Sequence, residues 1–435
     1  MKLYAHQQKL VDEAPDKHLL AWGCGSGKTI ATLKLASKSS TLVICPKSIK
    51  EQWCDEVKKH SKSVYCFILT KEGFKKEAPT LPKYDCIIVD EAHFFFGMTG
   101  FRKKSAMLKS LLAYIKKHNP EKIYLATATP YMSTPYNIYA AAQILGRQWD
   151  FRQYKEYFFN MVNMGRRFPV PVVKKGIEGD IAKLVQKLGS TVSLEDCFDV
   201  PEQTFLTEYF DLTREQKRAI NALDDEGIAR WTKTHQICGG TLKGDGYVES
   251  QSFKSEKMDR VLQLAEEHKK LIIVCRYNYE LQEIKKRLGR LKISCSIING
   301  ETQDRHAVVR ESERRRRHVN LIQASCSEGY ELPSFPVMVY YSYDFSLKNY
   351  IQMNGRILRA NKLKKNVYIS LVVKGGIDED VYKCIQSKKD FDLAIYDNPE
   401  KQQEIKCKER VKKEEDKWLS NQIFEAEQIR KKYDK

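Results

Sequence analysis

The chain has 435 residues, of which 42% are hydrophobic and 30% charged. That length is too great for one hydrophobic core and suits two or three domains. No apolar run approaches the ~18–20 residues of a membrane helix, and the N-terminus has no signal-peptide core, so we expect a cytoplasmic protein. The net charge of +19 favours a polyanionic partner, because Lys and Arg that neutralise phosphates release counterions. A basic enzyme of another kind is the alternative.

Short β-branched runs alternate with helical patterns along the whole chain. In the first half they cover 18–22, 41–46, 64–69, 84–90 and 122–127. In the second half they cover 271–275, 293–298, 319–323, 337–342 and 367–373. Continuous apolar strands separated by helices indicate parallel sheets covered on both faces. Two such series predict two α/β domains.

The segment between the two series has a different pattern. It is aromatic-rich and mostly helical, and we expect a helical insertion at about 131–190. A strand-like alternation at 203–211 then precedes a capped helix. We therefore predict a first domain at 1–195, a second at 196–400 and a charged helical tail at 401–435, which we expect to bind a protein partner or to pack on the second domain. The twelve cysteines lack zinc-ligand spacing and are expected to be reduced.

A glycine-rich turn follows the first strand and opens a helix, the context that a phosphate-binding loop requires. Its residues are Gly23, Cys24, Gly25, Ser26, Gly27, Lys28 and Thr29. Backbone N–H groups and the helix N-terminus would bind phosphate oxygens. Lys28 would reach the β- and γ-phosphates of ATP, and Thr29 would place its hydroxyl on Mg²⁺. Trp22 stands where a strict motif has glycine, and a turn without a ligand is the alternative.

An acidic box, Asp90-Glu91-Ala92-His93, ends the fourth strand. A strand that ends in Asp lies beside the phosphate loop in folds of this class. Asp90 would hold Mg²⁺ through its water shell, and Glu91 would orient and deprotonate the attacking water. His93 would link the state of the nucleotide to the next motif.

Together these motifs resemble helicase superfamily two, and within it the Swi/Snf type. The resemblance covers roughly residues 4–360 and implies two tandem RecA-like domains. Tyr4-Ala5-His6-Gln7 resembles an element in which Gln7 binds adenine, and LATATP at 125–130, with Thr127 and Thr129, is similar to motif III. Further similarities lie at 42–53, 271–277, 298–305 and 325–332, and the pattern QxxGRxxR follows at 352–359. Motifs III and V depart from the forms common in Swi/Snf proteins.

The arginines of the last motif are Arg356 and Arg359, and the resemblance implies that they act as arginine fingers. A guanidinium stabilises the charge that develops on the γ-phosphate. The two residues are three positions apart and would share one face of a helix. Gln352 of the same motif would couple ATP to motion, together with His93, Thr127 and Thr129. Because the arginines belong to the second domain, hydrolysis would require the domains to close.

The resemblance also implies where nucleic acid binds. The matching residues are Pro46, Lys47 and Ser48 in the first domain and Asn299, Gly300 and Ser325 in the second. They would contact phosphates, with little base preference. The run Arg314–Arg317 is either a further phosphate patch or a solvated helix end.

We therefore expect a DNA-stimulated ATPase that translocates on double-stranded or branched DNA as a monomer, in the manner of compact bacterial and bacteriophage proteins. Fork remodelling, branch migration and protein displacement are the roles that fit. A helicase that separates DNA or RNA strands is one alternative. A nucleic-acid-binding scaffold without ATPase activity is the other, and the intact ATP motifs argue against it.

Overall fold

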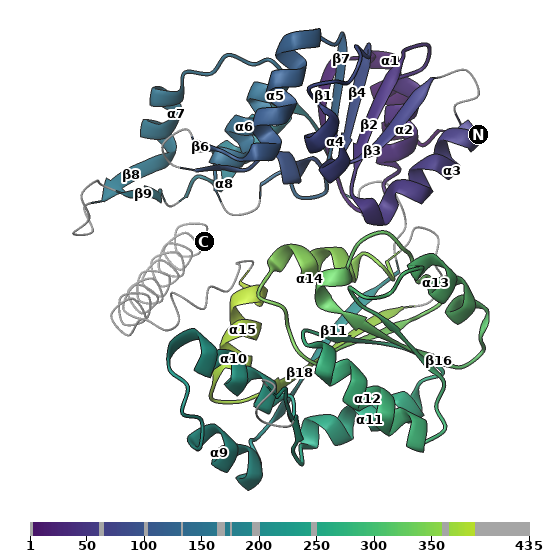
Figure 1. Cartoon of the computed structure of the whole chain (residues 1–435), viewed down its shortest axis with the longest axis vertical. Helices are drawn as coiled ribbons and strands as arrows, with labels where there is room; N and C mark the ends of the chain where they lie inside the picture. Colours follow the sequence, from purple (N-terminus) through teal and green to yellow (C-terminus); the bar gives the residue numbers. More distant parts are fainter. Residues whose placement is uncertain are drawn as a thin grey trace, which may run out of the picture.

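The computed structural model describes residues 3–60, 65–99, 103–131, 134–162, 170–174, 176–193, 201–244, 250–358 and 365–387. Within them the chain forms two α/β domains, one above the other in Figure 1. The expected domain boundary near 195, Arg359 and the tail at 401–435 lie outside the described residues.

The first domain is built on a six-stranded parallel sheet in the order β10-β1-β7-β4-β2-β3. Its strands are β1 (Lys17–Trp22), β2 (Thr41–Cys45), β3 (Cys66–Thr70), β4 (Cys86–Asp90), β7 (Lys122–Ala126) and β10 (Gly189–Val192). Its helices are α1 (Ala5–Glu13), α2 (Lys28–Leu35), η1 (Lys47–Ile49), α3 (Lys50–His60), α4 (Lys71–Glu77), η2 (Ala92–Phe95) and α5 (Ala106–His118). All five strands predicted for this half are present. The central strands of the sheet are buried on both faces, which explains why they are apolar along most of their length.

The insertion adds strands to the expected helices. It contains α6 (Tyr136–Ile144), α7 (Phe151–Phe158), α8 (Glu178–Leu188) and an antiparallel hairpin of β8 (Phe159–Val162) and β9 (Val170–Val173). Its last residues form β10, which pairs with β1 at the edge of the sheet. A short hairpin of β5 (Met98–Thr99) and β6 (Lys103–Lys104) precedes α5. The sequence did not indicate β10, since Gly189–Val192 is short and partly polar and gains its strand from pairing with β1.

The second domain repeats the design with the strand order β11-β18-β17-β14-β16-β15, again all parallel. The strands are β11 (Gln203–Phe210), β14 (Lys270–Cys275), β15 (Cys295–Ile298), β16 (His318–Gln323), β17 (Val337–Tyr340) and β18 (Asn366–Val373). The helices are α9 (Arg214–Asn221), α10 (Gly227–Cys238), α11 (Glu256–Glu267), α12 (Asn278–Arg290), α13 (Arg305–Arg314), η3 (Ala324–Cys326), α14 (Leu347–Asn354) and α15 (Ile377–Gln386). A short pair, β12 (Thr241–Leu242) and β13 (Gln251–Ser252), lies between α10 and α11. All the strands predicted here are confirmed, as is the helix capped by Thr213.

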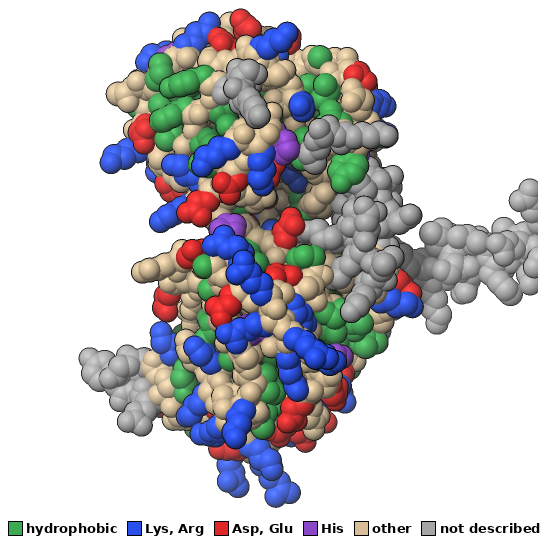
Figure 2. Space-filling view, turned by 90° about the vertical axis from the view of Figure 1, so that its right-hand side faces the viewer, with side chains coloured by type: hydrophobic (Ala, Val, Ile, Leu, Met, Phe, Trp, Pro, Cys, Tyr) green, Lys and Arg blue, Asp and Glu red, His purple; other side chains and the backbone are tan. Residues whose placement is uncertain are grey.

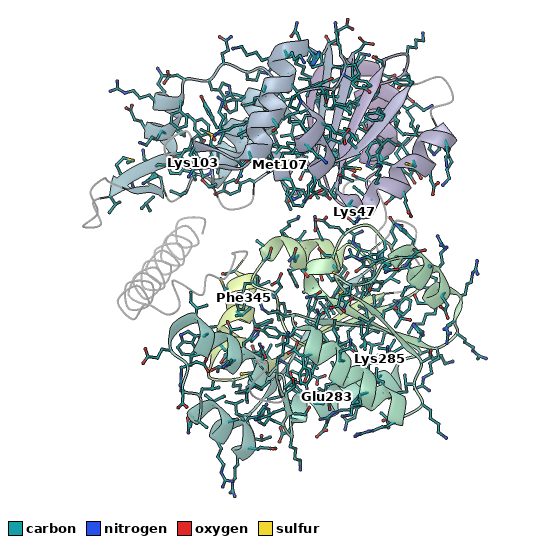
Figure 3. All side chains as sticks on the ribbon, viewed as in Figure 1. Lys47, Lys103, Met107, Glu283, Lys285 and Phe345 are labelled. Carbon is teal, nitrogen blue, oxygen red and sulfur yellow. The ribbon has the colours of Figure 1, made fainter. Side chains whose placement is uncertain are left out.

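Parallel strands bring the functional motifs to one edge of each sheet. In the first domain β1 leads into the glycine turn, β2 into Pro46 and β4 into the acidic box. In the second, β15 leads into Asn299 and β16 into η3. Figure 3 places Lys47 on the side of the first domain that faces the second. In an open α/β sheet, ligands bind outside the carboxyl ends of the strands.

Candidate active site

The glycine turn at the end of β1 has the backbone that a phosphate loop needs. Gly25 and Gly27 both have positive φ, +80° and +81°, a conformation that favours glycine. α2 begins directly after them at Lys28, so its N-terminal N–H groups face the turn. The Lys28 ammonium donates to the carbonyls of Trp22 and Gly23 at 2.9 and 3.0 Å. The lysine is therefore held across the mouth of the loop.

Helix α1 packs against this loop. The Gln7 side chain is buried, and its Nε2 donates to the Gly27 carbonyl at 3.0 Å, while its Oε1 accepts from the Tyr4 backbone at 2.9 Å. A Cβ at Gly27 would lie 2.2 Å from Gln7 Nε2. His6 Nε2 lies 2.8 Å from the Ser26 carbonyl oxygen. The structure therefore gives Gln7 a loop-supporting contact besides the adenine contact that the resemblance implies.

Trp22 occupies the position of the missing glycine because it belongs to the core. Its ring is 1% exposed and its Nε1 donates to Ser190 Oγ of β10 at 2.8 Å. The backbone after it is tied to the same strand, since Gly23 N donates to the Val192 carbonyl at 2.8 Å. Hydrogen bonds to Ser190 and Val192 therefore attach the start of the loop to β10.

The acidic box lies at the end of β4 with its two carboxylates held differently. Asp90 Oδ2 accepts from the Trp53 indole at 2.8 Å and Oδ1 from the Glu91 backbone at 2.9 Å. Glu91 has a left-handed backbone conformation with φ 47°, which is unusual for a residue other than glycine. Burial and the neighbouring Glu91 raise the pKa of Asp90. Burial acts the same way on Glu91, but the His93 contact and the charges of His93, Lys28 and Lys348 outweigh it and lower its pKa.

His93 connects the acidic box to the strand end at β7. Its Nδ1 lies 3.1 Å from Glu91 Oε2 and 3.1 Å from Thr127 Oγ1. Thr127 Oγ1 in turn accepts from the Thr129 backbone at 3.1 Å. The three residues expected to couple ATP to the next motif in this domain are therefore in one continuous chain of contacts that ends on Glu91.

The second domain reaches the glycine turn through the segment after α14. A Cβ at Gly355 would lie 3.1 Å from Cys24 Cβ, so the backbone of the last motif lies against the loop. α14 ends at Asn354, and Arg356 lies in the turn that follows rather than on a helix with Arg359. Its Nη1 donates to the Tyr330 carbonyl at 2.7 Å. Gln352 is fully buried, and its Oε1 accepts from Ser327 at 3.0 Å.

Two residues that sequence reasoning did not single out lie between the domains. The Lys348 ammonium of α14 lies 4.2 Å from the centroid of the Phe94 ring, two positions beyond the alanine of the acidic box. The same ammonium pairs with Glu328 Oε1 at 2.7 Å. No local pattern marks this contact, because its partners are separated by more than half of the chain.

The expected nucleic-acid residues gather at the carboxyl edges of the two sheets. Ser48 and the loop after η3 touch directly: a Cβ at Gly329, whose φ is +89°, would lie 2.6 Å from the Ser48 carbonyl oxygen. Lys47, Gly300 and Ser325 are exposed, while Pro46 and Asn299 are buried. The Gly300 backbone donates to Gln323 Oε1 at 3.3 Å. Pro46 and Asn299 are thus placed to shape the backbone of these turns rather than to offer a side chain.

The arginine run begins at the end of α13 and leads into the amino end of β16, at the opposite edge of the sheet. Arg315 pairs with Glu311 at 2.5 Å, and Arg317 donates to the Ala265 and Glu266 carbonyls at 3.2 and 2.8 Å. Arg315 therefore pairs within its own helix and Arg317 caps the end of α11, which favours the solvated helix end. Lys and Arg side chains are nevertheless scattered over the second domain on the face shown in Figure 2, among acidic and hydrophobic side chains.

The chain resembles known proteins over part of its sequence and most of its fold. Residues 254–361 match the helicase conserved C-terminal domain. Comparison with curated proteins gave no match. The Hef helicase domain of Pyrococcus furiosus is similar in structure, with a TM-score of 0.51 and 14% identity over 89% of this chain and 98% of that one. The Sulfolobus solfataricus SWI2/SNF2 ATPase core, solved in complex with dsDNA, gives a TM-score of 0.40 and 16% identity over 89% and 91%.

These findings define the class of fold. The two parallel six-stranded sheets flanked by helices are tandem RecA-like α/β domains, and the second carries the conserved helicase C-terminal region. None of the helices in the described ranges is long and apolar enough to cross a membrane.

Proposed function

We propose that this protein hydrolyses ATP with Mg²⁺ and uses the energy to translocate on nucleic acid, with double-stranded or branched DNA as its track. The observation that carries the proposal is the contact between the two domains at the glycine turn, where Gly355 of the last motif lies against Cys24. A nucleotide bound in the loop would therefore meet groups from both domains. Such a site can couple hydrolysis to domain motion.

The residues present fit a nucleotide and its metal ion. The positive-φ glycines and the N-terminus of α2 form a concave set of donors suited to phosphate. Lys28 would release its loop carbonyls to bind the terminal phosphates. Thr29 and Asp90 would share the metal ion, which neutralises developing phosphate charge when bound. A lysine and two carboxylates together at the carboxyl end of a parallel sheet suit this ligand.

Glu91 is the residue that would orient and deprotonate water. Its Oε2 lies 3.1 Å from His93 Nδ1, and a base must be held within hydrogen-bond reach of the proton it takes. Lys28 from the first domain and Arg356 and Arg359 from the second would stabilise the charge that develops during hydrolysis. Arg356 would have to leave the Tyr330 carbonyl, so we infer that ATP binding rearranges this turn.

DNA is proposed as the track because of the family resemblance and the basic surface. The net charge of +19 suits a polyanion, and the exposed Lys47, Gly300 and Ser325 border the junction of the domains. Backbone and hydroxyl contacts of this kind hold phosphates without reading bases. Strong salt dependence and little sequence preference are expected. Fork remodelling, branch migration and displacement of bound proteins are the uses that we propose.

This proposal is tested by measuring phosphate release under six conditions. They are no nucleic acid, single-stranded DNA, duplex DNA, forked DNA, four-way DNA and RNA. We expect stimulation by duplex or branched DNA, and duplex translocation without strand separation in a triplex-displacement assay. Stimulation by RNA alone would overturn the choice of DNA, and separation of duplex strands would replace translocase by helicase. No hydrolysis under any condition would leave a nucleic-acid-binding scaffold.

A further inference from the structure

Lys348 is a largely buried cation at the junction of the two domains. It lies in α14, on the side of the second domain that faces the first in Figure 1. Its side chain is 11% exposed, and its ammonium pairs with Glu328 Oε1 at 2.7 Å within the second domain. A desolvated ion pair is far less screened by salt than a surface pair. The position of Lys348 is therefore fixed by its own domain.

The same ammonium lies on an aromatic ring of the first domain. Its distance to the Phe94 ring centroid is 4.2 Å, and Lys71 of the first domain lies 3.2 Å from the same centroid. A cation over an aromatic face is attracted by the ring quadrupole, more strongly when both are withdrawn from water. Phe94 belongs to η2, and its ring lies 4.4 Å from the ring of His93, which holds Glu91. Lys348 is thus connected to Glu91 of the acidic box through the side chains of Phe94 and His93.

Two parallel links connect α14 to the loop after η3. Lys348 pairs with Glu328, and one helical turn further on Gln352 accepts from Ser327 at 3.0 Å. Residues four apart lie on one face of a helix, so both links use the same face. The next residue of the loop, Gly329, lies against the Ser48 carbonyl. A displacement of the loop by nucleic acid at Ser48 or Ser325 would therefore be transmitted to Lys348.

We propose that Lys348 is a positioning residue that transmits nucleic-acid binding to the acidic box, with Glu328 as its fixed partner and Phe94 as its contact in the opposite domain. The Lys348–Glu328 pair lies within one domain and persists when the domains separate. The Lys348–Phe94 contact spans the domains and exists only when they are together. That difference makes the contact a two-state element of the kind that coupling requires.

This inference rests on the proposed function, and the experiment separates the two. ATP turnover is measured in the full chain with and without a short DNA duplex, for wild type and Lys348→Met, with DNA affinity measured in parallel. In Lys348→Met we expect the stimulation factor to fall about 2- to 30-fold, the range of a typical coupling change, with DNA affinity close to wild type. Lys348→Arg, which keeps a cation for both partners, should recover most of the stimulation.

Matched variants exclude a simple loss of folding. Lys285 is an exposed lysine of α12, drawn in Figure 3 on the part of the second domain away from the first, and Lys285→Met should keep the wild-type stimulation factor. Phe94→Leu should lower stimulation as Lys348→Met does, and combining the two should add little. If Lys348→Met does not fold, the stimulation factor is measured in Phe94→Leu and Glu328→Gln instead.

The outcomes are distinct. A wild-type protein that DNA does not stimulate contradicts the proposed function, and this inference falls with it. A stimulated wild type with an unchanged stimulation factor in Lys348→Met and Phe94→Leu contradicts this inference alone. A loss in Lys348→Met that equals a loss of DNA affinity would show that the residue serves binding and would also overturn it.

Discussion

The two domains each contain a cluster of ionisable side chains, and the clusters differ in where they lie. In the first domain Lys28, Asp90, Glu91 and His93 lie at the carboxyl edge of the sheet, beside Cys24 and Phe94, which contact the second domain. In the second domain Lys257, Asp378, His235 and Glu280 are enclosed, each no more than 2% exposed. Charges that a ligand can reach suit chemistry, whereas charges sealed in a core must satisfy one another.

The enclosed cluster is satisfied almost entirely from within. Asp378 accepts from Lys257 Nζ at 2.8 Å and from the Val373 backbone at 2.7 Å, and its Oδ1 lies 3.2 Å from His235 Nε2. His235 Nδ1 lies 3.0 Å from the Tyr277 hydroxyl. These contacts join α10, α11 and α15 to β18. The comparison shows that an ionisable group with a strongly shifted pKa indicates an active site only where a reactant can approach the group.

The largest effect is expected in the first cluster. Lys28→Ala should abolish turnover. Glu91→Gln should lower turnover by about 10²–10⁴, the usual contribution of a general base, with ATP binding retained. Phosphate release and nucleotide-binding titrations check this. Lys34→Ala, an exposed lysine of the same helix α2, should turn over at the wild-type rate. Turnover near wild type in Glu91→Gln would show that the base is elsewhere.

Substitutions in the enclosed cluster should lower the free energy of unfolding rather than turnover. Asp378→Asn leaves Lys257 buried without a counter-charge, and losing one partner of a buried pair costs about 3–5 kcal/mol. Chemical denaturation measures the loss. The neighbouring Glu379 pairs with Lys383 at 2.7 Å near the surface, so Glu379→Gln should cost less than about 1 kcal/mol. Equal losses in the two variants would contradict the distinction between the clusters.

A smaller effect should appear as a pH dependence of stability. Burial raises the pKa of Glu280 from its ordinary 4.5 to about 7, against the hydrogen bond from Ser342 and the charge of Lys257. The stabilising contribution of the neutral acid is therefore complete below pH 4.5 and is lost as the pH rises through 7. Glu280→Gln should remove that loss, which is on the order of 3 kcal/mol for such a shift. Denaturation curves between pH 4.5 and 7.5 that keep the wild-type slope would show that Glu280 does not titrate there.

The sequence predicted the architecture well because both sheets are buried on both faces, which leaves long apolar runs at every central strand. It missed β10, whose Gly189–Val192 has no such pattern, and the hairpin of β8 and β9 inside an aromatic-rich segment. The motifs identified the residues at the sheet edges, since loop glycines and strand-end carboxylates have local signatures. The roles assigned to those residues stay predictions.

Contacts between domains could not be predicted in the same way. Lys348 has no motif of its own, and its partner Phe94 reads as an ordinary apolar residue beside the acidic box. Gly329 and Ser48 approach each other only because two separately folded sheets face one another. The helix expected to carry both arginines ends before Arg356, at Asn354, and the turn that follows places Gly355 against Cys24 of the glycine turn.

The most direct test of the account is ATP turnover and ATP affinity measured together in Arg359→Ala and Arg356→Ala. The account predicts that Arg359→Ala lowers turnover by about 10³ or more, as removal of an arginine finger does, while ATP affinity stays nearly intact. Unchanged turnover in both variants would mean that the second domain contributes no guanidinium to hydrolysis, and the proposed shared site would be wrong.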